Sequence, residues 1–207
     1  MNLWIVGVKW PPETFIERRI RALIASGIEV TVCSASPSVL SAQSNSPGLS
    51  LLYLPRLSRN WRNLLALARL IAMKLATAPR KSISLYKDFL GNPGWQAASH
   101  LLKTLPFINE KPDIIHFEWN FAAVDYLPLF DLLDCPIVIS CRGSQIHVAP
   151  HNPENSNKVK KLPATFQRAA AVHCVSQAIC EDAIKYGLDP KKAWIIRPAV
   201  DPDFFVP

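Results

Sequence analysis

Apolar runs alternate with amphipathic stretches along most of the chain. Residues 2–8 form a continuous apolar run, which is typical of a strand buried on both faces. Residues 14–27 then carry apolar side chains at helical spacing and end on Gly27, and residues 28–33 are again strand-like. The first part of the sequence therefore predicts a β-α-β unit.

The same order recurs twice. The later strands are expected at residues 112–119, 135–143, 170–176 and 193–198, with helices at 121–133 and 177–187. The Ser- and Pro-rich region 34–60 is less regular and predicts one further strand near 49–55. Strands that alternate with helices form a parallel sheet with helices on both faces. We therefore expect one α/β domain.

Length and cysteine content restrict the class of protein. The chain has 207 residues, of which 49% are hydrophobic, enough for one sizeable core. Its five cysteines include no C-x-x-C pair, which favours a reducing cytoplasm. The start has no basic leader, and no run reaches the roughly 18 apolar residues that a membrane span needs. We expect a cytoplasmic protein.

Positive charge is concentrated in the first half. Residues 1–110 hold 13 basic and 5 acidic side chains, whereas residues 111–207 hold 10 basic and 11 acidic ones. A block from Arg56 to Lys87 contains eight basic residues and no acidic one before Asp88. Such a block favours an anionic partner.

If residues 60–78 form a helix, Leu65 and Leu75 fall on an apolar arc and Lys74 lies outside it, and one interpretation is that this arc packs on the sheet. The alternative is peripheral docking of Arg56 to Lys87 on anionic lipid at the inner face of the membrane. We expect no nucleic acid, because no aromatic-rich motif accompanies the charge.

Ligands of open parallel α/β sheets bind beyond the carboxyl ends of the strands. After the first strand, Glu13 and Thr14 stand where a helix begins, with Thr14 as the expected N-cap. Free N–H groups at such a start can bind phosphate, but a simply capped turn would use the same residues. After the strand at 112–119, His116 and Glu118 alternate onto one face. They lack an evident third metal ligand, so we expect a polar cleft wall there.

The most informative stretch follows the strand at 135–143. Arg142 and Gly143 place a permanent cation beside a flexible backbone, and Ser144 and Gln145 come next. Arginine suits bidentate binding of phosphate, although a surface arginine in a turn is the structural alternative. Ser176 begins the last helix, where its role is either capping or lining the same cleft.

Four segments in this order resemble the N-terminal half of a family 4 glycosyltransferase of GT-B fold. They are "ETFIERRIRALIASGIEVTV", "PDIIHFEW", "PIVISCRGSQI" and the stretch from "AAAVHCVSQ" to "VDPDFFVP". The resemblance is closest to enzymes of exopolysaccharide or colanic-acid biosynthesis. It implies a Rossmann-like domain that binds the acceptor at residues 1–197, and at 198–207 the start of a linker to a C-terminal donor-binding domain that this chain lacks.

The resemblance also implies a reaction. A retaining enzyme of this kind transfers a sugar from a nucleotide-sugar donor to a saccharide or lipid-linked acceptor, without a cofactor or metal. The isolated half is expected to be inactive. The competing hypothesis is a non-catalytic module that binds sugar or phosphate.

This sequence departs from the family pattern at the proposed site. The usual glycine pair after the first strand is absent, Arg142 replaces the histidine of a His-Gly pair, and Gln145 replaces an aspartate. We therefore assign no catalytic residue. The expected substrate-binding residues are Glu13, Thr14, His116, Glu118, Arg142, Gly143, Ser144, Gln145 and Ser176.

Overall fold

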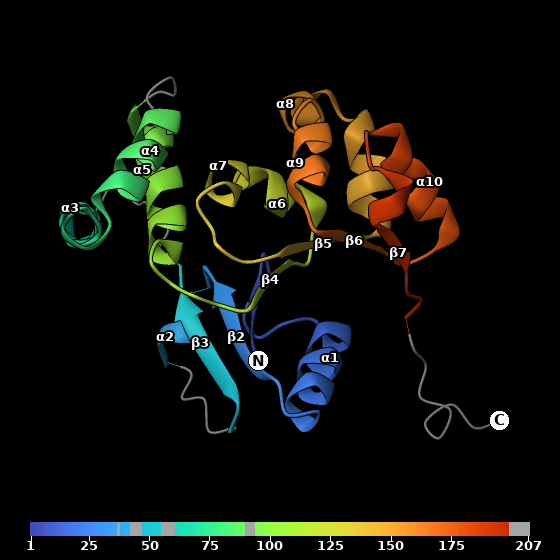
Figure 1. Cartoon of the computed structure of the whole chain (residues 1–207), viewed down its shortest axis with the longest axis horizontal. Helices are drawn as coiled ribbons and strands as arrows, with labels where there is room; N and C mark the ends of the chain where they lie inside the picture. Colours follow the sequence, from blue (N-terminus) through green and yellow to red (C-terminus); the bar gives the residue numbers. More distant parts are fainter. Residues whose placement is uncertain (37, 42–46, 55–60, 90–93, 199–207) are drawn as a thin grey trace.

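Seven parallel strands form one sheet in the order β3-β2-β1-β4-β5-β6-β7 (Figure 1). The strands are β1 (Asn2–Val6), β2 (Glu29–Ser34), β3 (Leu49–Tyr53), β4 (Ile114–Phe117), β5 (Ile137–Cys141), β6 (Ala171–Cys174) and β7 (Ala193–Ile195). The computed structural model describes residues 1–36, 38–41, 47–54, 61–89 and 94–198. The expected parallel, Rossmann-like α/β fold is confirmed. Most of the expected linker at 198–207 lies outside the described residues.

Helices connect the strands. They are α1 (Thr14–Ala25), α2 (Ser38–Ser41), α3 (Trp61–Thr77), α4 (Pro79–Phe89), α5 (Gly94–Thr104), α6 (Asn120–Asp125), α7 (Leu127–Phe130), α8 (Ser156–Val159), α9 (Leu162–Arg168) and α10 (Gln177–Lys185). Short turns of 3-10 or π-helix include η1 (Leu105–Phe107) and η2 (Ser144–Val148). The single helix expected at 121–133 is instead two, because Pro128 cannot donate a backbone hydrogen bond to a continuous helix.

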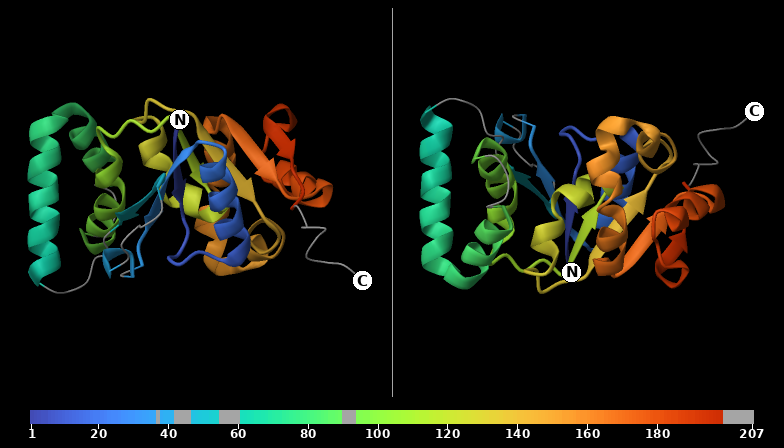
Figure 2. Two further views of the ribbon diagram at one scale, coloured as in Figure 1. Left: turned by 90° about the horizontal axis from the view of Figure 1, so that it is seen from below. Right: turned by 90° about the horizontal axis from the view of Figure 1, so that it is seen from above.

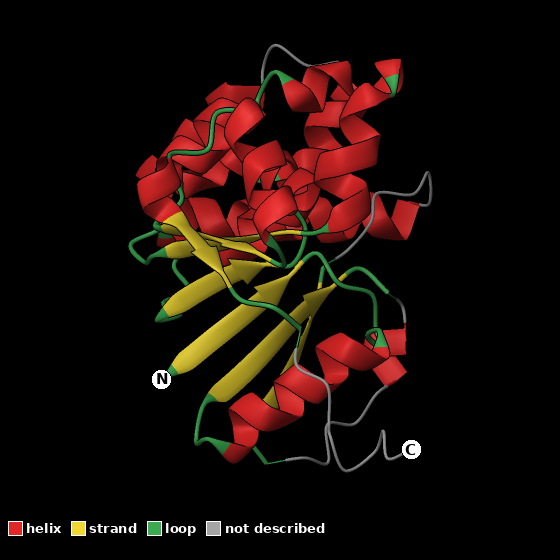
Figure 3. Ribbon diagram, turned by 90° about the vertical axis from the view of Figure 1, so that its right-hand side faces the viewer, coloured by secondary structure: helices red, strands yellow, loops and turns green. Residues whose placement is uncertain are grey.

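Alternate side chains of β1 pack into two different hydrophobic cores, one on each face of the sheet. Leu3 and Ile5 pack with Ile16 and Ile20 of α1 on one face of the sheet. Trp4 lies in the larger core on the other face. Figure 3 shows most helices on that second side and α1 on the first, and Figure 2 shows the same layers from below and above. Both faces of the sheet are thus covered, as the continuous apolar pattern of the strands requires.

Helices α3, α4 and α5 form a helical flap beside the sheet, between β3 and β4 in sequence (Figure 1). The sequence places Leu65 and Leu75 on the inward side of α3 and Lys74 outside it, but this expectation is wrong. Leu65 is 58% exposed and Leu75 is 40% exposed, whereas Lys74 is 7% exposed. The helix contacts α4, α5 and η1 instead of lying flat on the sheet, so a different face is buried.

Lys74 fixes α3 to the segment that leads into β4. Its Nζ donates to the carbonyl oxygen of Ile108 at 2.6 Å and lies 3.5 Å from Glu110 Oε1. The carbonyl of Ile108 follows η1, where a helix end leaves acceptors unsatisfied. A buried amine is tolerated here because it is hydrogen-bonded and paired.

Replacement of Lys74 by alanine should therefore destabilise the protein. We expect Lys74→Ala to lower the free energy of unfolding in urea by about 1–3 kcal/mol, the cost of leaving a buried polar group without its partner. Arg69→Ala, an exposed position on the same helix, is the matched control and should change it by less than about 0.5 kcal/mol. Equal effects of the two substitutions would contradict the anchoring role.

Candidate functional site

The candidate site lies at the carboxyl edge of the sheet, where β1 and β4 are neighbours. Chain connections leave in opposite directions at this point, because β1 pairs with β2 on one side and with β4 on the other. Such a switch point leaves a crevice beyond the strand ends. Glu118 follows β4 directly, and Arg142 follows β5, so both residues lie at this edge.

A fully buried carboxylate occupies the centre of the site. The side chain of Glu118 is 0% exposed and accepts hydrogen bonds from Arg19 of α1 and from Arg142. The contact from Arg142 Nη2 to Glu118 Oε2 measures 3.1 Å. The backbone N–H of Glu118 also donates to the carbonyl of Val6 at the end of β1. One residue thus ties α1, β1, β4 and β5 together.

Arg142 lies among aromatic side chains as well. Its guanidinium carbon is 4.8 Å from the ring centroid of Phe15 in α1 and 5.9 Å from that of Trp119. Both distances fall within the range of a cation–π interaction. The side chain is 15% exposed, so Arg142 is held in place by the fold while part of it still reaches the surface.

Burial makes the two arginines costly to charge. Desolvation, with a smaller contribution from the charge of Arg142, lowers the pKa of Arg19 to about 10. Desolvation also lowers the pKa of Arg142, and the nearby charge of Glu13 opposes that shift. Both residues stay protonated at neutral pH. With one carboxylate between two guanidinium groups, the cluster of Arg19, Glu118 and Arg142 carries a net charge of +1.

A chain of hydrogen bonds crosses three strands beside this cluster. His116 Nε2 lies 2.8 Å from Ser140 Oγ, and Ser140 Oγ lies 2.9 Å from His173 Nδ1. The other ring nitrogen of His173 faces the carbonyl oxygen of Ile196 at 2.9 Å. A carbonyl only accepts, so neutral His173 carries its proton on Nε2 and accepts from Ser140. Ser140 in turn accepts from His116 Nε2.

Because His116 donates from Nε2, its neutral ring has no proton on Nδ1. That Nδ1 atom lies 3.7 Å from Glu118 Oε1. Burial lowers the pKa of His116 well below 6.5, and the charges of Arg19 and Arg142 and the electrostatic coupling to the His173 ring add to this shift. Burial likewise lowers the pKa of His173. Both rings are therefore neutral at pH 7.

The N-cap of α1 is not the residue that the sequence predicted. Glu13, not Thr14, is the N-cap, and its side chain makes no capping hydrogen bond. Thr14 is the first residue of the helix, so its expected capping role is wrong. Both residues are exposed. At the start of α10, Ser176 is the N-cap, and its Oγ accepts from the backbone N–H of Ile179 at 3.3 Å.

The loop after Arg142 lies against α6. Gln145 Oε1 accepts from the backbone N–H of Phe121 at 3.2 Å, and its backbone carbonyl accepts from Asn120 Nδ2 at 3.1 Å. Gly143 and Ser144 are exposed, and a Cβ on Gly143 would meet nothing within 4 Å. Gln145 therefore holds this loop in place, whereas Gly143 and Ser144 face solvent.

A polar pocket of about 450 Å³ lies along the same edge, on the β1–β2 side. Its walls come from the segments that follow β1, β2 and β3, and from α5 and α6. Lys9, Lys103 and Asp125 contribute its charged side chains. Gly7 lines it with φ of 89°, and a Cβ there would come within 2.9 Å of the Cβ of Ala122. The chain needs glycine at this turn.

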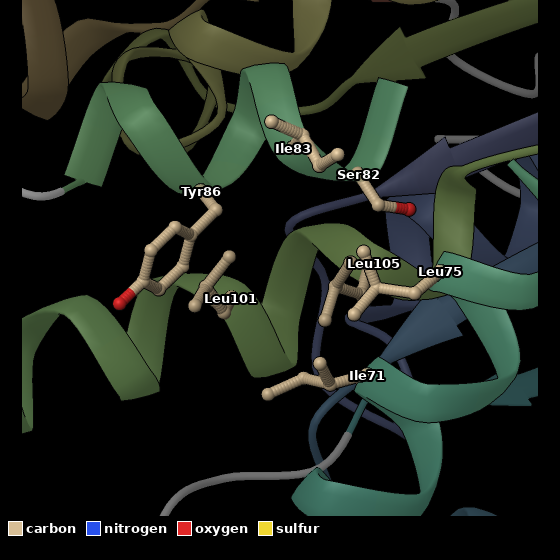
Figure 4. Close-up of a pocket in the computed structure, with 7 residues that line it drawn as sticks. All are labelled: Ile71, Leu75, Ser82, Ile83, Tyr86, Leu101 and Leu105. Carbon is tan, nitrogen blue, oxygen red and sulfur yellow. The ribbon is translucent and has the colours of Figure 1, made fainter. Parts of the chain in front are cut away.

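An apolar groove of about 280 Å³ lies within the helical flap (Figure 4). Its lining residues are Ile71, Leu75, Ser82, Ile83, Tyr86, Leu101 and Leu105. The hydroxyl of Ser82 donates to the backbone carbonyl of Lys74 at 3.0 Å. Within the described ranges, no group of three or more His, Cys, Asp or Glu residues could hold a metal ion.

Sequence reasoning missed Arg19, Ser140, His173 and the polar pocket. Arg19 lies 99 positions before its partner Glu118, and nothing local distinguishes it from the exposed basic residues beside it. Ser140 and His173 meet through the register of β5 and β6. That register could be inferred only once the strand order was known.

Comparison with known proteins gives the family. The model of Glycosyltransferase Family 4 matches residues 12–204. The chain belongs to glycosyltransferase family 4. A comparison with curated proteins gave no significant match.

Solved structures agree with the fold. The Anabaena protein HepE in complex with UDP-glucose superposes with a TM-score of 0.53 at 11% identity, and its complex with UDP and glucose gives 0.55 at 14%. Each match covers 97% of this chain and 44% of the HepE chain. The family 4 domain thus has the architecture of one half of a GT-B glycosyltransferase, and it spans less than half the length of HepE.

The half-buried His116 and His173 of this family 4 domain predict a pH-dependent stability. In the folded state the pKa values of these two histidines lie below 6.5, so on acidification the unfolded chain binds protons at a higher pH than the folded chain does. The stability that is present above pH 6.5 is therefore lost as the pH falls. We expect the free energy of unfolding to fall by up to about 1.4 kcal/mol per pH unit for each histidine below that pH.

The test is urea unfolding of the wild type and of His116→Gln between pH 7.5 and 5. The wild type should lose more stability than the variant over this interval, by roughly 1 kcal/mol or more. His151→Gln, at an exposed histidine, is the control and should keep the wild-type slope. Parallel pH profiles for wild type and His116→Gln would contradict the neutral, half-buried state of His116.

Proposed function

We propose that this chain is the acceptor-binding domain of a retaining glycosyltransferase that uses a nucleotide-sugar donor. The sugar would go to a hydroxyl of a saccharide or lipid-linked acceptor in cell-surface polysaccharide biosynthesis. The observation that carries the proposal is the family 4 match over residues 12–204, together with charged and polar features at the switch point of the sheet. The donor half of the reaction would belong to a second domain.

Arg142 is the residue best placed to contact a donor phosphate. A guanidinium has five N–H donors, and the described hydrogen bond to Glu118 uses one of them. The remaining donors lie on a side chain that is held by Phe15, Trp119 and Glu118, so little conformational entropy is lost on binding. A positioned cation of this kind stabilises the charge that develops on a departing diphosphate.

Arg142 is a poor proton donor even with its lowered pKa, so its proposed contribution is electrostatic. Gly143, Ser144 and Gln145 would form the wall of the cleft beside it. Glu13, Thr14 and Ser176 would lie at the same edge, at the starts of α1 and α10. His116 and Glu118 would act indirectly, by fixing Arg142 and the ends of β4 and β5.

The function is tested with and without a donor-binding domain. We expect the purified chain by itself to transfer no sugar, because donor and acceptor must be held together, which supplies about 7–11 kcal/mol of the barrier. Fusion to the C-terminal half of a family 4 enzyme should produce transfer from UDP-glucose or another nucleotide sugar to lipid-linked saccharides. Transfer should fall about 10- to 100-fold in the fused Arg142→Ala variant, from loss of a charge-assisted contact.

Arg142→Ala also removes a partner of Glu118, so stability must be measured in parallel. Arg168→Ala, which removes an exposed ion pair with Asp131, is the matched control and should keep full activity. Robust transfer by the lone chain would contradict the proposed division of labour. An Arg142→Ala fusion that is less stable but fully active per folded molecule would make Arg142 a structural residue.

The helical flap supports membrane docking, with changes from the sequence-based hypothesis. Arg69, Arg80 and Lys87 are exposed, and exposed Met73 and Tyr86 lie on the same helices. Lys74 is buried and Lys81 pairs with Asp134 at 2.7 Å, so neither is free for lipid. Arg56 and Arg59 lie outside the described residues. None of the helices in the described ranges is long and apolar enough to span a bilayer.

We propose that this surface lies on anionic lipid, with the apolar groove of Figure 4 facing the acyl region. Each basic residue near such a surface contributes about 1 kcal/mol. The chain should co-sediment with anionic vesicles more than with neutral ones, and Arg80→Gln with Lys87→Gln should weaken this about ten-fold or more. The double change Lys160→Gln with Lys191→Gln is the charge-matched control. Equal binding to both vesicles, or none, would contradict docking.

A further inference from the structure

The polar pocket on the β1–β2 side of the edge is lined by two lysines from separate parts of the chain. Lys9 follows β1, and Lys103 lies in the last turn of α5. Among the described residues, neither ammonium group has an ion-pair or hydrogen-bond partner. Two cations that share one pocket repel each other and gain from a bound anion.

The acidic residue of the pocket does not supply that anion. Asp125 Oδ2 accepts from Lys158 Nζ at 2.9 Å, so its charge is already balanced from outside the pocket. Two of its hydroxyl groups are engaged internally: Ser34 Oγ donates to the carbonyl of Val8 at 2.8 Å, and Ser36 Oγ accepts from Trp10 N–H at 3.0 Å. The pocket therefore retains a positive charge that its own polar groups do not neutralise.

Helix α5 separates this pocket from the apolar groove. Ser99 and Lys103 of α5, four residues apart, line the polar pocket, whereas Leu101 of α5 and Leu105, the first residue of η1, line the groove. Residues four apart lie on one face of a helix, so α5 presents one polar and one apolar face to two different cavities. A ligand with a phosphate group and a hydrocarbon chain would find a matching surface on each side of this helix.

We propose that the polar pocket binds the phosphate group of the acceptor substrate through Lys9 and Lys103. The identification of the ligand as an acceptor rests on the proposed function; the phosphate site itself does not. The pocket and Arg142 lie at the same edge of the sheet, at the ends of different strands. A phosphate held by the lysines would leave the donor phosphates to Arg142, so the two anionic groups need not compete. The source of the phosphate is either a phosphorylated saccharide or an isoprenyl phosphate.

Nuclear magnetic resonance on the ¹⁵N-labelled chain tests this site without requiring activity. The probes are a hexose 1-phosphate, the same hexose without phosphate, and water-soluble geranyl phosphate. We expect both phosphates to shift the amide signals of residues 7–9, 34–36 and 99–103 in a saturable way, and the neutral hexose to leave them unchanged. Lys9→Gln or Lys103→Gln should weaken binding of both phosphates about ten-fold or more.

Two variants make this result specific. Lys103→Arg keeps the charge and should retain most of the binding, and the exposed Lys160→Gln makes the same charge change elsewhere and should keep the wild-type affinity. Tighter binding of geranyl phosphate, with additional shifts near Ile71 and Ile83, would identify a lipid phosphate. Tighter binding of the hexose 1-phosphate, without shifts near Ile71 and Ile83, would identify a phosphorylated saccharide.

Other outcomes would overturn the phosphate site. They are the absence of saturable shifts at millimolar probe, shifts centred on Arg142 instead of the pocket, and equal loss of binding in Lys160→Gln and the two pocket variants. A failed transfer assay would leave a positive binding result intact. Conversely, transfer without phosphate binding would refute the lysine site and leave the proposed function standing.

Discussion

The buried carboxylate of Glu118 is the interaction on which the candidate site depends. A carboxylate without solvent contact is stable only when its charge is paired and its oxygens are hydrogen-bonded. Arg19 from α1 and Arg142 from the end of β5 supply both pairs. Removal of Glu118 would leave two neighbouring guanidinium groups without their shared counter-charge, and an uncompensated buried charge typically costs about 3–5 kcal/mol. Removal of one arginine would still leave the carboxylate paired with the other. The cluster therefore fixes the position of α1 relative to the carboxyl ends of β4 and β5.

This constraint also explains the electrostatics around it. Burial, reinforced by the excess positive charge of the two arginines, keeps His116 neutral, and neutral His116 can then donate to Ser140 in the chain that reaches His173. Arg142 remains partly exposed at the edge, while Lys9 and Lys103 line a separate pocket there. The domain thus presents cationic groups at two places along one edge of its sheet, which suits substrates with more than one phosphate.

The fold could be predicted from the sequence because its signals are local. The apolar run of β1, the helical spacing in α1 and the stop at Gly27, which has φ of 79°, are each contained within a short window. Strand order and parallel pairing then follow from general rules of connection. The inward face of α3 could not be predicted in this way, because the helix contacts other helices and buries Lys74 against a distant carbonyl.

The site could be predicted only in part. The edge position of Glu118 and Arg142 follows from the ends of their strands, but their pairing with each other and with Arg19 requires the three-dimensional arrangement. The expected cap at Thr14 was wrong by one residue, since Glu13 adopts the extended backbone of an N-cap without a side-chain hydrogen bond. Polar residues near a helix start do not by themselves fix which residue is the cap.

The coupling energy between Glu118 and Arg142 tests the central claim most directly. It is obtained from urea unfolding of the wild type, Glu118→Ala, Arg142→Ala and the double variant. We predict that the double variant is more stable than the sum of the single effects implies, by about 1–3 kcal/mol, as for residues that share one buried network. Additive effects within about 0.5 kcal/mol would contradict the claim that this ion pair organises the site.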